Sequence, residues 1–227
     1  MDWLAPIDAY CERIEPGLFG EPLNALSNIS FFLAAAWAAK AARAARADWP
    51  LWLLITVVLL IGLGSLAFHL FANQWSVLAD VIPITLFIYG YLAFALRRLL
   101  AVRWIGIAAS LVVLFAADAL IDRATPPGFF NGSGPYLPPL VASLIVSLAL
   151  RARGHPASPY ILAASIVLLI SIFFRTIDLL VCPVLPIGTH FLWHLLNGLV
   201  LALYLEAGIR FGAHHPHAEM RSRGLEP

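Results

Sequence analysis

The sequence predicts an all-α integral membrane protein, a polytopic bundle of seven transmembrane helices. Hydrophobic residues make up 61% of the 227-residue chain and charged residues 12%, against roughly half and a quarter in soluble domains. Seven apolar stretches approach or exceed the length of about 20 residues that a membrane span needs. They leave almost no chain for a soluble region, so we expect residues 1–227 to form one seven-helix membrane domain. The formal net charge of +1, without a basic face carrying aromatics, gives no indication of nucleic-acid binding.

The predicted spans follow one another with short connections. Glu21-Pro22 marks the start of the first, because proline suits the first turn of a helix and an acid suits its positive end. His69 lies near the end of the second span, and Asp80 lies near the start of the third. The fifth span is the shortest, and the seventh opens with two histidines. The seven stretches are 22–46, 50–71, 77–99, 102–121, 135–150, 158–182 and 187–212.

The basic residues predict the orientation in the membrane. Eleven of the fourteen Lys and Arg residues follow the odd-numbered spans, whereas Arg13, Arg123 and Arg175 lie toward the other side. The positive-inside rule then places the N-terminus outside and the C-terminus in the cytoplasm. We expect residues 1–21 to be an acidic outer leader, not a signal peptide, and residues 213–227 a cytoplasmic tail. We expect a bacterial inner membrane, with the outer side facing the periplasm.

Three histidines are predicted to lie at a similar depth near the outer face. His190 and His194 are one helical turn apart and therefore project from the same side of their helix. Ser65 precedes His69 by the same spacing, and Asp80 opens the next span. Ionisable side chains are costly in lipid and mark functional sites. The pattern therefore predicts that all five side chains belong to one site.

This set of side chains is typical of a catalytic zinc site. Zinc prefers imidazole nitrogen, and three protein ligands leave a position open for water, whose pKa the metal lowers to about 7. Asp80 is suited to accept the proton, and Ser65 to bond an oxyanion on the attacked carbonyl. The alternative is that each histidine bonds a helix carbonyl or packs at the membrane interface. The same histidine spacing also occurs in bis-imidazole haem proteins and metal transporters.

The acidic leader suggests a second metal site. Asp8, Glu12, Glu15 and Glu21 lie just before the first span, and carboxylates separated by turn-forming residues can surround a calcium ion. The alternative is a solvated acidic segment that only obeys the charge rule.

The two cysteines are predicted to meet. Cys11 lies in the leader and Cys182 at the outward end of the sixth span. Disulfides persist on the oxidising side of a bacterial membrane, so a Cys11–Cys182 bridge would hold the leader over the mouth of the bundle. Two unpaired buried thiols are the alternative.

Two charges inside the sixth span need partners. Arg175 and Asp178 are spaced at i and i+3, which allows them to pair with each other. Asp178 is alternatively suited to orient a metal-bound histidine.

These motifs, taken in order, resemble the alkaline ceramidases and the seven-helix hydrolase superfamily that contains the adiponectin receptors. The resemblance covers nearly the whole chain, from Asp8 to about Arg210. It rests on D-x-Y-C-E-R with E-P-x-N-x-L-S-N in the leader and first span, then G-S-L-A-F-H, the aspartate that follows, C-P, and H-x-x-x-H.

The resemblance implies a zinc amidase that cleaves the N-acyl bond of a ceramide-like lipid, giving a fatty acid and a sphingoid base. His69, His190 and His194 would hold zinc, Ser65 and Asp80 would be catalytic, and the cysteine bridge would be the family disulfide. Asp8, Glu12 and Glu21 would hold the family's calcium ion. Ile14 stands where the family has an asparagine ligand, so one calcium oxygen is missing.

Two other functions compete with the amidase. One is a seven-helix lipid receptor or sensor in which a structural zinc holds three helices together. That function needs a fourth protein ligand, and the sequence offers no convincing candidate. The other is a metal or proton transporter, which should place ionisable residues through the full depth of the membrane. Here they gather toward one end. The sequence does not predict the oligomeric state.

Overall fold

The computed structural model describes residues 2–15, 17–126 and 128–212, so the predicted tail at 213–227 lies outside the described residues. Within those ranges the only strand-like pairing is an isolated bridge between Pro6 and Asn73. The helical elements are α1 (Pro22–Ser27), α2 (Ile29–Ala44), α3 (Trp49–Phe71), α4 (Gln74–Arg98), α5 (Trp104–Ala124), η1 (Phe129–Gly132), η2 (Gly134–Tyr136), α6 (Leu137–Ala152), α7 (Ser158–Val181) and α8 (His190–Phe211).

The predicted fold class is confirmed, because seven segments of the described chain are long and apolar enough to cross a membrane. Each begins and ends within a few residues of a predicted stretch. The first span, however, is divided between α1 and α2 at Asn28, and this break was not predicted. The Asn28 side-chain amide donates to the Asn24 carbonyl at 2.8 Å, and such local bonds compete with regular helix pairing. Which side of the membrane each end faces stays a prediction.

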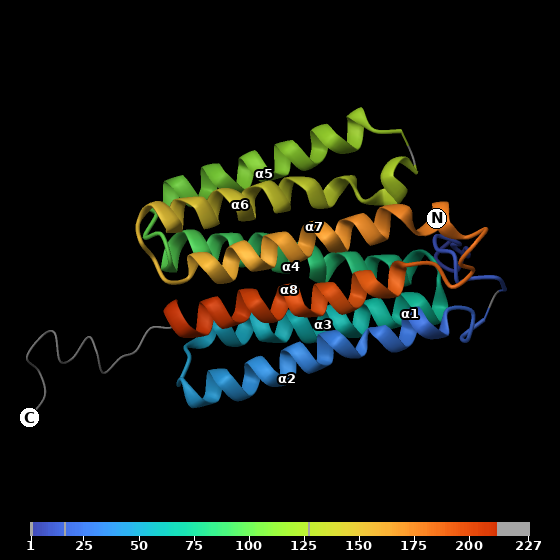
Figure 1. The fold of residues 1–227 in the computed structure, drawn as a ribbon, viewed down its shortest axis with the longest axis horizontal. Coiled ribbons are helices and arrows are strands. Elements are labelled where there is room, and N and C mark those ends of the chain that lie inside the picture. The colour runs from blue at the N-terminus through green and yellow to red at the C-terminus, as the bar shows by residue number, and fades with distance from the viewer. Residues whose placement is uncertain (1, 16, 127, 213–227) are drawn as a thin grey trace, which may run out of the picture.

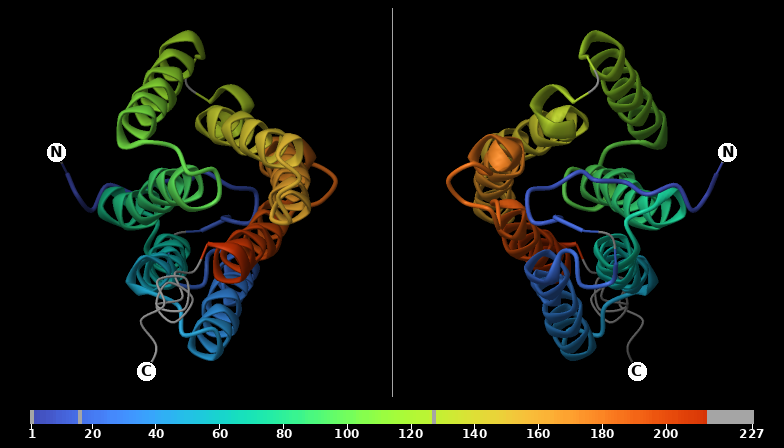
Figure 2. Two further views of the ribbon diagram at one scale, coloured as in Figure 1. Left: turned by 90° about the vertical axis from the view of Figure 1, so that its left-hand side faces the viewer. Right: turned by 90° about the vertical axis from the view of Figure 1, so that its right-hand side faces the viewer.

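The long helices lie side by side along the longest axis of the molecule (Figure 1). The leader and the α7–α8 connection lie at one end of the bundle, which we call the leader end. End-on views show α8 in the interior between α7 and α2, and α5 at the edge (Figure 2). Accordingly, α8 has twelve buried residues, whereas the buried residues of α5 are Ile107 and Leu114.

Small residues fix α8 closely against α2. Ala34, Ala38 and Ala42 form one buried face of α2 at intervals of one helical turn. On α8, a Cβ placed on Gly198 would lie 2.6 Å from the Cβ of Ser30, so only glycine permits this approach. Small residues promote close helix packing where lipid supplies no hydrophobic driving force between helices. This contact therefore holds α8, which carries His190 and His194, close to α2.

Candidate metal centre

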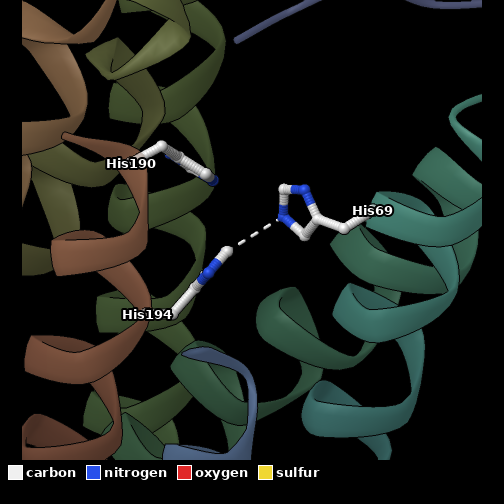
Figure 3. A group of neighbouring side chains, drawn as sticks. All are labelled: His69, His190 and His194. Carbon is white, nitrogen blue, oxygen red and sulfur yellow. Dashed lines mark hydrogen bonds between the residues drawn. The ribbon is translucent and has the colours of Figure 1, made fainter. Parts of the chain in front are cut away.

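Three buried histidines converge at the leader end (Figure 3). His69 lies in the last turn of α3, and His190 and His194 in the first two turns of α8. Each offers a ring nitrogen, and the three nitrogens lie within 4.8 Å of one another. The Nε2 atoms of His69 and His194 are 3.0 Å apart, close to the separation of about 3.3 Å that two nitrogens at about 2.0 Å from a tetrahedral zinc would have. The predicted convergence of these side chains is confirmed.

Neighbouring groups hold two of the three rings from behind. The Nδ1 atom of His69 lies 2.6 Å from a Glu21 carboxylate oxygen, and the Nδ1 atom of His194 lies 2.7 Å from the Ser27 hydroxyl. Such bonds to the outer nitrogen orient a metal-bound imidazole and set its tautomer. Both rings therefore present Nε2 to the centre of the group.

The third ring, His190, is held by stacking. Its plane lies 15° from that of Tyr10, with ring centroids 3.5 Å apart. Its Nδ1 atom is buried and has no hydrogen-bond partner among the described residues. Buried polar atoms are nearly always satisfied, so a ring that carries an unpaired buried nitrogen and offers a nitrogen to two other imidazoles fits a metal ligand. Imidazole nitrogens are a donor set that suits zinc.

Asp178 positions the start of α8 rather than pairing with Arg175. Its Oδ1 atom accepts hydrogen bonds from the backbone N–H groups of Thr189 at 2.6 Å and His190 at 2.8 Å, and its Oδ2 atom accepts from Cys11 N–H at 3.0 Å. Among the described residues, no ion pair joins Arg175 to Asp178. The predicted pair between Arg175 and Asp178 is therefore wrong. The carboxylate binds backbone N–H groups that would otherwise lack a partner at the start of α8. Asp178 therefore acts through the backbone of His190, not through its ring.

Ser65 and Asp80 lie beside the histidines. A Cβ on Gly64 would lie 1.9 Å from the Ala79 carbonyl oxygen, so α3 and α4 touch backbone to backbone here. The Asp80 carboxylate interacts electrostatically with His69 and with the Ser65 hydroxyl. Its Oδ1 atom is buried without a hydrogen-bond partner in the described chain. The structure thus brings both predicted catalytic residues to the metal-ligand group and leaves one carboxylate oxygen available.

The leader glutamates are engaged by the protein itself. Both oxygens of Glu12 accept backbone N–H bonds, from Leu23 at 2.6 Å and Asn24 at 2.7 Å, and so cap the start of α1. Arg13 donates from Nε to Glu21 at 2.5 Å and from a terminal nitrogen to the His69 carbonyl at 3.0 Å. Burial alone would raise the pKa of Glu21, but His69 and Arg13 outweigh it and lower that pKa.

The calcium site of the leader stays a prediction. Within the described residues, one group of three or more ligating side chains lies close enough together to hold a metal ion, and it consists of the three histidines. Asp8, Glu12 and Glu21 do not form such a group. The positive charge among the leader acids is supplied by Arg13. Sequence reasoning missed this role, although Arg13 is the lone basic residue in an acidic segment.

The predicted disulfide between Cys11 and Cys182 is present, with the Cα atoms 5.4 Å apart. It joins the leader to the end of α7, across a separation of 171 residues. Because Tyr10 and Glu12 flank Cys11, the bridge also holds the ring that stacks on His190 and the carboxylate that caps α1.

An apolar cavity lies in the bundle below the histidines. Its upper wall includes Trp193 and Phe31, whose rings lie 6.5 Å from His190 and 6.0 Å from His194. Its far end is lined by Tyr204 and Ala95. On α4 the lining runs from Ile84 to Ala95, which at 1.5 Å per residue is about 16 Å. Trp193 lines the cavity, whereas Phe71 and Trp75, at the end of α3 and the start of α4, are exposed.

Comparison with known proteins finds no family model and no curated protein that matches the chain.

Proposed function

We propose that this protein is a zinc-dependent membrane amidase that hydrolyses the N-acyl bond of a ceramide-like lipid. One observation carries the proposal: three buried imidazoles converge beside a carboxylate and a hydroxyl, directly above an apolar cavity. Ligand sites that combine an apolar pocket with a few convergent polar groups are typical of enzymes acting on apolar substrates. The motif resemblance to the alkaline ceramidases supports the same activity.

The proposed reaction needs zinc ligands, a proton acceptor and a hydrogen-bond donor, and the site contains each of them. His69, His190 and His194 would hold zinc. A bound zinc ion would polarise the substrate carbonyl group and lower the pKa of its water to about 7. Asp80, with a free carboxylate oxygen, would accept the proton of the attacking water and later return one to the leaving amine. Ser65 donates a hydrogen bond to the carbonyl oxygen as it gains charge.

The cavity and the outer partners of the histidines prepare the site for this reaction. The cavity holds the acyl chain and excludes water from the helices below. Glu21 and Ser27 keep two imidazoles aimed at one point, so little reorganisation is needed when the amide arrives. The basic residues on alternate connections support placing the leader end on the periplasmic side of a bacterial inner membrane. The Cys11–Cys182 bridge, which needs an oxidising compartment, supports the same placement.

Two observations favour catalysis over the competing functions. A structural zinc would need a fourth protein ligand, and none joins the histidine group within the described chain. A transport path would need ionisable groups along the cavity, whereas the cavity lining is almost entirely apolar.

The test is fatty-acid release from defined N-acyl lipids by purified protein in nanodiscs. We expect activity that needs zinc and disappears in His190→Ala. His155→Ala is the matched control, because His155 lies between α6 and α7 and contacts Phe211, away from the site. Wild-type activity in His190→Ala, or no hydrolysis of any N-acyl lipid by zinc-loaded wild type, would overturn the proposal.

A further inference from the structure

Arg175 is a charged side chain in a predicted membrane span without a salt-bridge partner. It lies in α7, and no described carboxylate pairs with it. One terminal nitrogen donates to the Tyr10 hydroxyl at 2.6 Å, and the Nε atom is buried without a partner among the described residues. An arginine at this depth is costly and marks a functional group.

Three aromatic rings fix the position of the Arg175 guanidinium. Its central carbon lies 5.4 Å from the ring centroid of Tyr10, 5.4 Å from that of Tyr136 and 5.2 Å from that of Trp193. Rings at this distance hold a cation by its attraction to their faces. Tyr136 and Trp193 line the cavity, and Tyr10 stacks on His190. The guanidinium therefore lies beside both the cavity and the histidines.

No carboxylate of the described chain occupies the donors of the guanidinium. Asp80 is the acid that interacts with it electrostatically, but the same carboxylate also interacts with His69 and Ser65. Arginine presents a planar fork of donors that suits two acceptor oxygens at once. Only one hydrogen bond from the fork, to Tyr10, is made in the described chain. The fork is thus suited to bind an anion that enters with the substrate.

We propose that Arg175 recognises an anionic oxygen group, a carboxylate or sulfonate, that the lipid carries next to its amide. This rests on the proposed function for the position of the amide, since a tail in the cavity and an amide at the histidines bring the head group to Arg175. Within the N-acyl lipids of the proposed function, the preferred substrates are then those with an acidic head group, such as N-acyl amino acids.

The test compares binding of two lipids that differ in one group. N-palmitoylglycine ends in a carboxylate, and N-palmitoylethanolamine ends in a hydroxyl at the same place. Binding to metal-loaded protein in nanodiscs is measured at 4 °C from the quenching of tryptophan fluorescence, and hydrolysis is measured separately. A charge-assisted hydrogen-bonded pair predicts at least about ten-fold tighter binding of the acid by wild type. In Arg175→Gln the two lipids should bind about equally.

Three controls separate recognition from structure. Arg123→Gln removes an exposed positive charge from the last turn of α5 and should keep the preference. Tyr10→Phe removes the hydrogen bond to Arg175 but leaves the charge of Arg175 in place. This variant should also keep the preference for the acid. Arg175→Lys keeps the charge without the fork and should fall between wild type and Arg175→Gln. Loss of the preference in Tyr10→Phe to the same degree as in Arg175→Gln would mean that Arg175 only holds the leader, and would overturn the proposal.

The remaining outcomes distinguish this inference from the amidase itself. Equal binding of both lipids by wild type overturns the anion-site proposal. Binding of palmitate that depends on Arg175, without a preference between the two amides, also overturns it, because the site would then bind the fatty-acid product. An Arg175-dependent preference without hydrolysis of either lipid supports the anion site while it overturns the proposed function.

Discussion

Glu21 should control the zinc affinity of the site, although it is not itself predicted to touch the metal. Its Oε2 atom lies 2.6 Å from His69 Nδ1 and its Oε1 atom 2.5 Å from Arg13 Nε. Glu21→Gln keeps the shape of the side chain but removes the charge that fixes the ring. Loss of such an outer partner typically lowers metal affinity by about 10- to 100-fold. At about 1.4 kcal/mol per factor of ten, this is about 1.4–2.8 kcal/mol.

The same substitution should also lower the stability of the metal-free protein. The side chains of Arg13 and Glu21 are 7% and 1% exposed, so the arginine would be left buried without an opposite charge. Breaking a buried ion pair costs about 3–5 kcal/mol. Because glutamine retains one oxygen acceptor for Arg13, we expect a loss near the lower end, about 3 kcal/mol.

The assay is competition for zinc between the purified protein and a chromophoric chelator, with thermal unfolding of the apo protein measured in parallel. Glu15→Gln is the matched control, because Glu15 is exposed in the same acidic segment. It should leave both quantities unchanged. Zinc affinity in Glu21→Gln equal to that of the control would refute the reasoning that His69 is held by Glu21.

Three further outcomes are expected. Asp80→Asn should lower the rate of fatty-acid release by about 10²–10⁴-fold with zinc retained, since the carboxylate has a free oxygen and is not in the ligand group; zinc loss on metal analysis would contradict this. Cys11→Ala breaks the link between leader and α7 and should lower the free energy of unfolding by about 2–4 kcal/mol, measured by denaturant titration. Gly64→Ala should reduce thermal stability and activity, because its Cβ would lie 1.9 Å from the Ala79 carbonyl oxygen. Gly90→Ala, whose Cβ would meet its nearest neighbour at 3.6 Å, should behave like wild type in both measurements.

The architecture was predictable from the sequence because lipid imposes a simple rule. A span must be apolar over about 20 residues, so the seven stretches stand out by length alone. The break at Asn28 was not predictable in this way, since it depends on a side-chain bond to the Asn24 carbonyl rather than on hydropathy.

The histidine group was also predictable, for a related reason. Helical spacing places His190 and His194 on one face, and the order of the spans places His69 at the same end of the bundle. The cysteine bridge follows from the same ordering. These features depend on where residues lie along the membrane normal, which the sequence encodes directly.

Partner choice within the site was not predictable. Helical spacing suggested a pair between Arg175 and Asp178, but backbone N–H groups from the α7–α8 connection bind Asp178. Likewise, the spacing of the leader acids did not indicate that Arg13 folds back onto Glu21. Both outcomes depend on how loops close over helix ends, and neither hydropathy nor periodicity describes those loops.

X-ray absorption at the zinc edge, combined with metal analysis, tests the central claim most directly. The claim is that imidazoles from α3 and α8 share one ion. The account predicts about one zinc per chain, with three nitrogen ligands and one oxygen ligand at about 2.0–2.2 Å. Zinc should be lost in both His69→Ala and His194→Ala and retained in His155→Ala. A zinc signal unchanged by either site substitution, or a spectrum without imidazole scattering, would contradict it.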